Sequence, residues 1–205
     1  MSKKYIFTIN AASKSLCLKN LSQNKDIVFL HWLNEEVGLI EYNGKTPFYK
    51  VVYTTPLYHI RHIFEVYYCF CNDENLYQNI FKFSEKCLDK NLNFSFQIRK
   101  TLDASFDNKC IINFSGELQQ KGYELCVKAP QQIISIFATK NNTYVGVGNA
   151  KTNLSNQKGG MYHFSTSRNF ISRAEYKLLE AIDCFDIDLS NCKNAIDLGA
   201  SPGGW

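Results

Sequence analysis

The chain has 205 residues, of which 45% are hydrophobic and 14% aromatic, so it can bury a core in one large domain or two small ones. A net charge of +4 is too modest to indicate a nucleic-acid-binding protein by itself. No apolar run approaches the ~20 residues of a membrane-spanning helix, and the N-terminus turns polar too early for a secretory signal. We therefore expect a cytoplasmic protein that does not engage a membrane.

The eight cysteines are spaced irregularly, and the sequence contains no Cys-x-x-Cys pair. This argues against a thioredoxin-like redox site and a zinc ribbon, so we predict reduced thiols. His59 and His62, followed by Cys69 and Cys71, could be taken for a metal cluster. They fit a polar or RNA-facing helix end better, so we expect no metal.

The first seventy residues predict a small α/β unit. Residues 5–9 suit a strand, and Leu16, Cys17 and Leu21 recur at helical spacing after it. Further strands are expected at residues 28–30, 37–42, 51–53 and 64–70. This order fits a ferredoxin-like, split β-α-β arrangement over residues 1–72 and an α+β fold class.

A second unit is expected over residues 73–149. Leu76, Ile80, Phe83 and Cys87 form the apolar stripe of a helix that starts near Asn75. The remaining expected elements are a strand at 93–99, a helix through 111–118 ended by Lys121 and Gly122, and strands at 123–127, 133–137 and 144–147.

Basic side chains around an expected linker at residues 150–170 are the candidates for RNA contact. Residues 140–177 hold six basic residues and a single acidic one, Glu175. The side chains that we predict to bind RNA are Lys140, Lys151, Lys158, Arg168 and Arg173. A solvated linker explains the same charges equally well. Aromatic side chains at positions 67, 68, 94 and 96 are expected in the core rather than stacked on bases.

A new element begins near residue 171. Ser172 and Glu175 form a capping box for a helix whose buried stripe is Ala174, Leu178, Ile182 and Phe185. Residues 195–198 then predict a buried strand that runs into a loop with glycines at 199, 203 and 204. Glycines there let the backbone approach a nucleotide-like cofactor, although a plain strand-to-helix turn also uses glycine. Their spacing matches neither Gly-x-Gly-x-x-Gly nor a phosphate-binding loop.

Two motifs of this region resemble the FtsJ-type ribose 2′-O-methyltransferases, in the order that the family has them. They are Ser-Arg-Ala-Glu-Tyr-Lys-Leu-Leu-Glu at 172–180 and Asp-Leu-Gly-Ala-Ser-Pro-Gly-Gly-Trp at 197–205. The resemblance implies S-adenosylmethionine as cofactor and Lys177 as the first lysine of a Lys-Asp-Lys-Glu catalytic set. It implies a cofactor site that includes Gly199, Ser201, Pro202, Gly203, Gly204 and Trp205.

Helical spacing is compatible with a catalytic Lys177. Arg173, Lys177 and Glu180 fall on a face apart from the buried stripe, so the lysine can point toward a cleft while the helix stays docked. The alternative is a solvated Lys177 paired with Glu180.

The middle unit, residues 75–148, resembles a THUMP domain, an RNA-binding module of RNA-modifying enzymes. The order of ferredoxin-like unit, THUMP, linker and FtsJ-like domain resembles the RlmM-like group of large-subunit rRNA 2′-O-methyltransferases. This resemblance implies RNA, in particular rRNA, as the partner. Ser201 departs from that group, which tends to carry cysteine at this position.

The chemistry implied by the resemblance needs residues beyond this sequence. A ribose 2′-hydroxyl must lose its proton as it attacks the methyl group, and a lysine with a pKa of ~10.4 accepts that proton only if burial or another cation lowers its pKa. In the family the second lysine and the carboxylates follow the cofactor loop, so we expect the 205-residue chain to be inactive. Two alternatives stay open: a stand-alone RNA-binding module, and another nucleotide-dependent enzyme that shares only the glycine loop.

Overall fold

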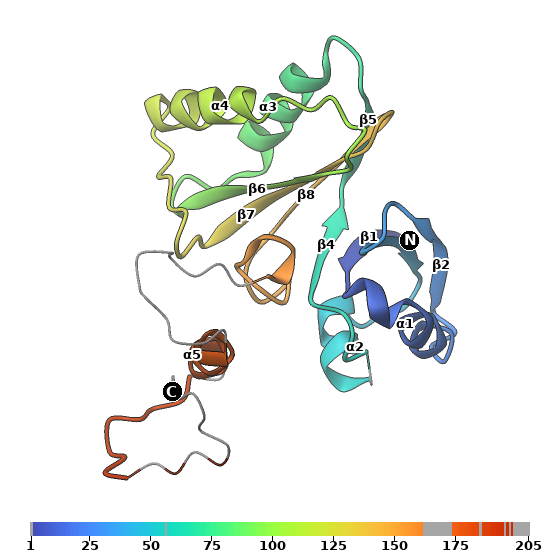
Figure 1. The fold of residues 1–205 in the computed structure, drawn as a ribbon. Helices are drawn as coiled ribbons and strands as arrows, with labels where there is room; N and C mark the ends of the chain where they lie inside the picture. The colour runs from blue at the N-terminus through green and yellow to red at the C-terminus, as the bar shows by residue number, and fades with distance from the viewer. Residues whose placement is uncertain are drawn as a thin grey trace. The chain divides into compact units, whose positions relative to one another are not determined.

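A computed structural model describes residues 2–55, 57–161, 174–184, 186–194, 196 and 198 of the chain. The chain divides into two compact units, Met1–Met161 and Tyr162–Trp205, which are described separately below. The first unit contains two four-stranded sheets with their helices, and the second contains one described helix (Figure 1). Among the described helices, none has the length and apolar character needed to cross a bilayer.

The first sheet is fully antiparallel and has the strand order β2-β3-β1-β4. Because successive side chains of a strand point to opposite faces, Tyr5 and Phe7 of β1 enter the core beneath α1 and α2, whereas Ile6 enters a cluster on the other face. The elements are β1 (Lys3–Thr8), the 3-10 turn η1 (Ala11–Ser13), α1 (Lys14–Leu21), β2 (Ile27–Trp32), β3 (Val37–Tyr42), α2 (Phe48–Thr54) and β4 (His62–Val66).

Residues 51–53 belong to helix α2, so the predicted strand there is wrong. The helix starts after Pro47, and its buried residues Phe48, Val51 and Val52 are spaced to lie on one helical face. They pack into the core with Tyr5 and Tyr42. Burial of this stripe outweighs the strand preference of the two valines, which is worth only a fraction of a kcal/mol per residue, roughly 0.5.

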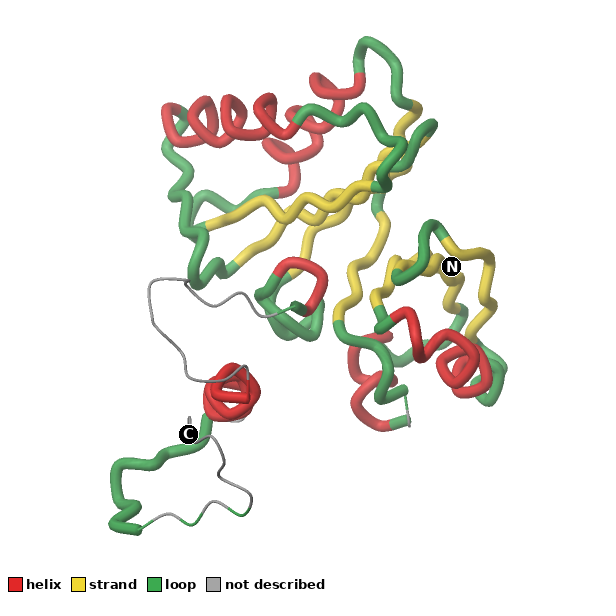
Figure 2. Tube along the Cα trace, in the orientation of Figure 1, coloured by secondary structure: helices red, strands yellow, loops and turns green. Residues whose placement is uncertain are grey.

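The second sheet has the order β5-β8-β7-β6, and β6 and β7 form its one parallel pair. Helices α3 and α4 cover one face of this sheet (Figures 1 and 2). β7 is buried along its whole length, as expected for a strand between two neighbours and beneath a helical layer. The elements are β5 (Tyr68–Cys71), α3 (Leu76–Cys87), β6 (Phe94–Lys100), α4 (Asn108–Gln120), β7 (Gln132–Ala138) and β8 (Asn142–Gly148).

The predicted end of α4 is confirmed, but the strand predicted after it is not. Gly122 has a φ of +88°, the left-handed conformation that commonly follows a helix. Residues 123–127 make only an isolated bridge, between Leu125 and Phe94, before the chain bends. Two backbone hydrogen bonds to Phe94 therefore replace the predicted strand ladder.

The two sheets of the first unit are joined by one extended segment. β4 leaves the first sheet, and Tyr67 donates its backbone N–H to the carbonyl of Val145 on β8 at 2.9 Å, just before β5 begins. Gly146 permits this approach, because a Cβ there would lie 1.9 Å from the carbonyl oxygen of Glu65. An apolar cluster fills the space between the sheets, formed by Ile6, Val37, Leu39, Phe64, Phe137 and Tyr144.

The chain after β8 folds back over both sheets as far as Met161. Asn153 is 1% exposed, accepts the N–H of Ile63 through its carbonyl, and donates its side-chain amide to Ser135. Further along, the 3-10 turn η2 (Lys158–Gly160) accepts the hydroxyl of Thr8 at the carbonyl of Gly159, at 2.8 Å. The described part of the expected linker is thus attached to the first unit.

The described part of the second unit is mainly helix α5 (Ala174–Cys184). Leu178 and Ile182 of the predicted stripe are half-buried, whereas Ser172, of the predicted capping box, lies outside the described residues. Ile196 and Leu198 are 88% and 93% exposed. The predicted buried strand is therefore wrong at these two residues, because such a strand is buried by neighbouring strands, and none pairs with it in the described part of the chain.

A candidate nucleic-acid interface

A polar cleft of about 380 Å³ opens in the first unit, between β1 and β4 on one side and the end of β8 on the other. The loop at residues 44–47 and helix α2 form a third wall, which contributes Lys45 and Tyr49. Tyr67 of the extended connection is 49% exposed and forms part of the lining. The wall from β8 and its following loop is polar and contains Asn149, Thr152 and Asn153.

The carboxylate of Glu65 is already engaged by two neighbours inside this cleft. Lys3 Nζ lies 2.9 Å from one carboxylate oxygen, and the Tyr5 hydroxyl donates a hydrogen bond to the other at 3.1 Å. The hydrogen bond to Glu65 raises the pKa of Lys3, whereas burial and the same carboxylate raise the pKa of Tyr5. Both groups thus stay protonated at neutral pH: the Lys3 ammonium balances the charge of Glu65, the one carboxylate in the described lining, and the uncharged Tyr5 hydroxyl donates a hydrogen bond to it.

The cleft offers binding groups rather than a catalytic pair. Its described lining contains tyrosine, lysine, asparagine and threonine side chains, with no cysteine or histidine. Aromatic faces can stack on nucleobases, and ammonium groups can meet phosphates. Among the residues that the structure describes, no three His, Cys, Asp or Glu side chains are grouped to hold a metal ion.

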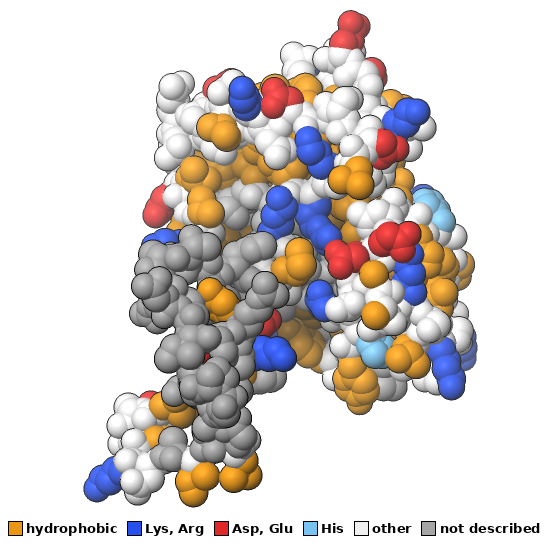
Figure 3. All heavy atoms as spheres, viewed as in Figure 1, with side chains coloured by type: hydrophobic (Ala, Val, Ile, Leu, Met, Phe, Trp, Pro, Cys, Tyr) orange, Lys and Arg blue, Asp and Glu red, His pale blue; other side chains and the backbone are white. Residues whose placement is uncertain are grey.

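A group of basic side chains, here called the basic cluster, lies where β6 and η2 meet the start of β4. It consists of Arg61, Arg99 and Lys158, with Glu36 beside it at 3.6 Å from Arg99 Nη2. Burial and the neighbouring Arg99 lower the pKa of Lys158. Burial also lowers the pKa of Arg99, with Arg61 acting in the same direction and Glu36 against it. Figure 3 shows Lys and Arg side chains gathered on this face, next to acidic ones.

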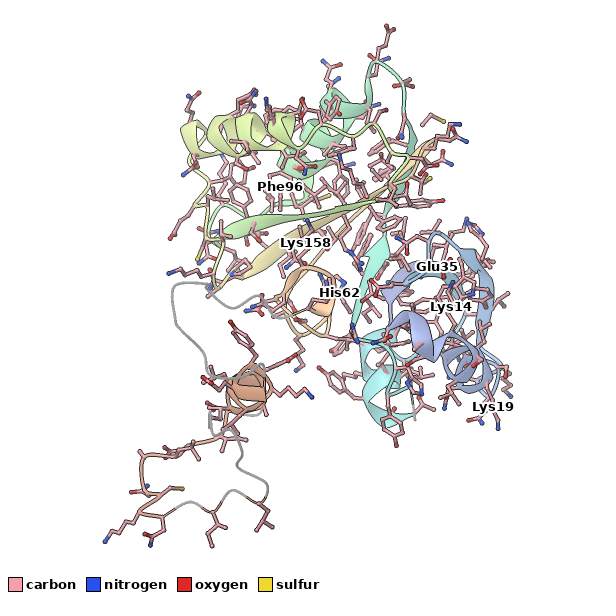
Figure 4. The ribbon with its side chains drawn as sticks, viewed as in Figure 1. Lys14, Lys19, Glu35, His62, Phe96 and Lys158 are labelled. Carbon is pink, nitrogen blue, oxygen red and sulfur yellow. The ribbon has the colours of Figure 1, made fainter. Side chains whose placement is uncertain are left out.

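His62, labelled in Figure 4, is the first residue of β4 and lines a small hollow together with Arg99 of the basic cluster. It is 4% exposed, and its Nε2 has no hydrogen-bond partner in the described structure. The pKa of His62 is lowered to about 4, first by burial and then by the charge of Arg99, whereas the interaction with Gln97 acts in the opposite direction. The predicted helix end at His59 and His62 is wrong. Residues 58 and 59 form a turn, and His62 starts a strand.

The structure describes three of the five basic residues predicted to bind RNA. Lys140 is exposed in the turn between β7 and β8, Lys151 is exposed in the loop after β8, and Lys158 is exposed at the start of η2. Of these, Lys158 is coupled to Arg99. Arg168 and Arg173 lie outside the described residues.

Lys177 is the one predicted methyltransferase-site residue within the described ranges. It is exposed on α5, and no salt bridge between it and Glu180 is among those formed by described residues. The predicted cofactor residues, which are Gly199, Ser201, Pro202, Gly203, Gly204 and Trp205, lie outside the described ranges.

Sequence reasoning missed the cleft and most of the basic cluster. Lys3 is more than forty positions from Lys45 and Tyr49 in the chain, and only the fold brings them to the same cleft. Arg61 and Arg99 are separated by 38 positions in the same way. The sequence feature that could have indicated this contact is the pair Gly159-Gly160. Both residues have positive φ values, and because they lack a Cβ, η2 can approach Arg99 and Arg61 closely.

The aromatic prediction is confirmed for Phe94 and wrong for two tyrosines. Phe94 is fully buried, whereas Tyr67 and Tyr68 are each 49% exposed. Tyr68 stacks on Phe70 with an interplanar angle of 4°. Strand alternation identifies which side chains share a face, but it does not say whether another layer covers that face.

The C-terminal residues match a known protein family. A model of the family described as FtsJ-like methyltransferase matches residues 170–205, the region that contains Lys177 and the glycine-rich loop. Proteins named ribosomal RNA large subunit methyltransferase E, from two strains of Halobacterium salinarum, are 42% identical to this chain over 52 residues. The match covers 25% of this chain and 20% of those proteins, so the chain spans about a fifth of their length.

The chain resembles solved structures in fold. The match to TrmN from Thermus thermophilus covers 71% of this chain and 45% of the TrmN chain, with a TM-score of 0.53 and 12% identity. PH1313 from Pyrococcus horikoshii gives the same score and identity over 54% of its chain. A 4-thiouridine synthetase in complex with RNA and ATP matches 72% of this chain and 41% of its own, with a TM-score of 0.50 and 10% identity. These likenesses confirm a mixed α/β fold of the kind found in TrmN.

Proposed function

We propose that this chain is the RNA-binding portion of an S-adenosylmethionine-dependent RNA methyltransferase that modifies a ribose 2′-hydroxyl of large-subunit rRNA. The observation that carries the proposal is the FtsJ-like match at residues 170–205, directly after a folded α/β unit with an open polar cleft. The name of the Halobacterium relatives, ribosomal RNA large subunit methyltransferase E, supports rRNA as the substrate.

The strand order of the first sheet supports a ferredoxin-like unit, which was expected over residues 1–72; its last strand, β4, ends at Val66, and β5 belongs to the second sheet. The elements of this unit follow the sequence β-α-β-β-α-β, and β1 lies between β3 and β4 in an antiparallel sheet, which is the split β-α-β arrangement. For residues 73–149 we propose a THUMP-like domain. The fold likeness to a 4-thiouridine synthetase solved with RNA is in keeping with this assignment.

Residues 150–170 then connect to an FtsJ-like domain that starts at residue 171. Within it, Lys177 is proposed as a catalytic lysine, and the glycine-rich loop at 199–205 as part of the S-adenosylmethionine site. The exposure of Lys177 on α5 is compatible with this role, because the side chain is not used in packing the helix.

In this proposal the cleft of the first unit receives a segment of the RNA. Tyr49 and Tyr67 supply aromatic surface, and Lys45 supplies a positive charge without a paired carboxylate among the described salt bridges. The Lys3–Glu65 pair leaves little net charge at the inner wall, so binding there depends on stacking and hydrogen bonds as well as on phosphates.

The test is the affinity of the full chain for a fluorescent rRNA fragment, measured across a salt series beside a titration with S-adenosylmethionine. RNA binding that weakens with salt is expected. The variant Lys45→Gln should weaken binding by roughly threefold to tenfold, whereas Lys25→Gln, an exposed lysine outside the cleft, should not. No RNA binding by the unmodified chain would refute the proposal.

A stand-alone RNA-binding module is the second candidate. It is favoured by one observation, since the cleft and the basic cluster lie entirely within Met1–Met161. The test uses the full-length gene product. If it binds RNA but neither binds S-adenosylmethionine nor transfers a methyl group, this candidate is favoured.

A further inference from the structure

The basic cluster holds more positive charge than its protein neighbours neutralise. Among the salt bridges of described residues, only one involves Arg61, Arg99 or Lys158, that of Arg99 with Glu36 at 3.6 Å. Mutual repulsion helps to lower the pKa of Lys158 and of Arg99, after burial. An anion placed among these cations would reverse both effects, because an opposite charge favours the protonated form.

The fold brings the backbone segments that carry these cations close together. A Cβ at Gly159 would lie 2.6 Å from Arg99 Nη1, and a Cβ at Gly160 would lie 2.5 Å from the carbonyl oxygen of Arg61. Both glycines have positive φ values, +65° and +69°, which an L side chain rarely adopts. The turn that carries Lys158 is therefore pressed against β6 and the start of β4. Such a preformed arrangement loses little entropy when it binds a ligand.

His62 lines a small hollow beside the basic cluster. Its Nε2 is buried without a hydrogen-bond partner, as are Gln97 Oε1 and Arg99 Nη1, and all three side chains line one small hollow. Unpartnered buried polar atoms cost free energy in an isolated protein, so a group of them beside a set of cations suggests that something else completes the site. The hollow measures about 10 Å³, which fits one water molecule but not a phosphate.

We propose that the basic cluster is a phosphate-binding site at which Lys158, Arg61 and the outer edge of Arg99 hold the anion, next to the hollow that His62, Gln97 and Arg99 line. The guanidinium groups suit phosphate, because their paired N–H groups match two phosphate oxygens. This inference rests on the proposed function, in which the phosphate that binds here belongs to the RNA backbone. The site then fixes the path of RNA at the junction of β6, η2 and β4 in the first unit.

The first measurement uses inorganic phosphate and the full chain. The ring resonances of His62 should shift as phosphate is added, and Lys158→Gln should weaken the phosphate affinity by roughly tenfold, since one charge-assisted contact is removed. Lys158 is exposed, so the variant should fold. Lys19→Gln is the matched control, since Lys19 is an exposed lysine of α1 away from Lys158 (Figure 4). The proposed site is overturned if phosphate does not shift the ring resonances of His62, or if Lys158→Gln binds phosphate as tightly as the parent chain.

The second measurement uses the rRNA fragment across a salt series. For Lys158→Gln and for Arg61→Gln, the slope of log affinity against log salt should fall by about 0.7 to 1. Lys19→Gln should keep the parent slope. Unchanged RNA binding by both cluster variants, with phosphate binding lost, would overturn the assignment to RNA and leave a site for free phosphate. If the parent chain binds no RNA at all, the proposed function fails, and the phosphate titration alone decides the site.

Discussion

His62 links the stability of the first unit to pH. Its pKa is lowered from 6.5 to about 4 by burial, so the folded state keeps the imidazole neutral over a range in which the unfolded chain protonates it. Stability must therefore fall as pH drops from about 6.5 to about 4, because the unfolded state binds the additional proton there. The full shift corresponds to roughly 3 kcal/mol.

The corresponding measurement is the free energy of unfolding in urea at several pH values between 4 and 7. His62→Gln should flatten this dependence, whereas His59→Gln, which removes a half-buried histidine from the preceding turn, should leave it in place. Carboxylates protonate in the same range and affect all three proteins alike, so the difference between the variants isolates His62. Equal slopes for the parent and His62→Gln would contradict the assignment.

At the scale of elements, the approach of β4 to β8 depends on one glycine. A Cβ at position 146 would lie 1.9 Å from the Glu65 carbonyl oxygen, and a backbone atom cannot turn aside as a flexible side chain can. Gly146→Ala must then separate the two strands and weaken the hydrogen bond from Tyr67 to Val145. We expect it to lower the free energy of unfolding by roughly 2 to 3 kcal/mol.

Gly116→Ala is the matched control for this substitution. Gly116 lies inside helix α4, and nothing lies within 4 Å of a Cβ built there. Alanine at that position should stabilise the protein by up to about 1 kcal/mol, because glycine is a poor helix former. Urea unfolding of both variants tests the pair, and equal stability of Gly146→Ala and the parent would show that β4 and β8 can separate without loss.

The sequence predicted best those elements in which the spacing of the apolar residues agrees with the face that is buried in the structure. The stripe at Leu76, Ile80 and Phe83 became the buried face of α3, and β1 was predicted from residues 5–9. α2 was missed because two adjacent valines favour a strand locally, while packing on Tyr5 and Tyr42 favours a helix. The predicted strand at 123–127 failed because strand pairing depends on a partner, which a single segment cannot specify.

For the candidate interface, the sequence predicted only residues that belong to one continuous basic stretch. Lys158 was selected from a basic stretch and does belong to the basic cluster, but Arg61 lies just before β4 and Arg99 lies on β6, far from Lys158 in the chain. The cleft is made by β1, β4, α2 and the loop after β8, so no window of the sequence includes it. Gly159 and Gly160, which were predicted as a linker, instead allow a close contact between chain segments.

At the scale of the whole first unit, the two sheets should unfold as one. An apolar cluster between them joins Ile6 and Phe64 to Phe137 and Tyr144, and the segment from β4 to β5 passes from one sheet to the other. Separating the sheets would expose this cluster and break the Tyr67–Val145 hydrogen bond, which makes a state with only one folded sheet unfavourable.

A chain that ends at Met161 allows a direct test, because Trp32 is then its one tryptophan. Trp32 packs on Phe7 and Phe29 at centroid distances of 5.6 and 5.1 Å, so its fluorescence reports the first sheet alone. Far-UV circular dichroism reports both sheets and includes α3 and α4 of the second. We expect the two signals to give the same urea midpoint. A fluorescence transition that is complete while most of the helical signal remains would mean that each sheet folds by itself, and that the cluster between them contributes little to stability.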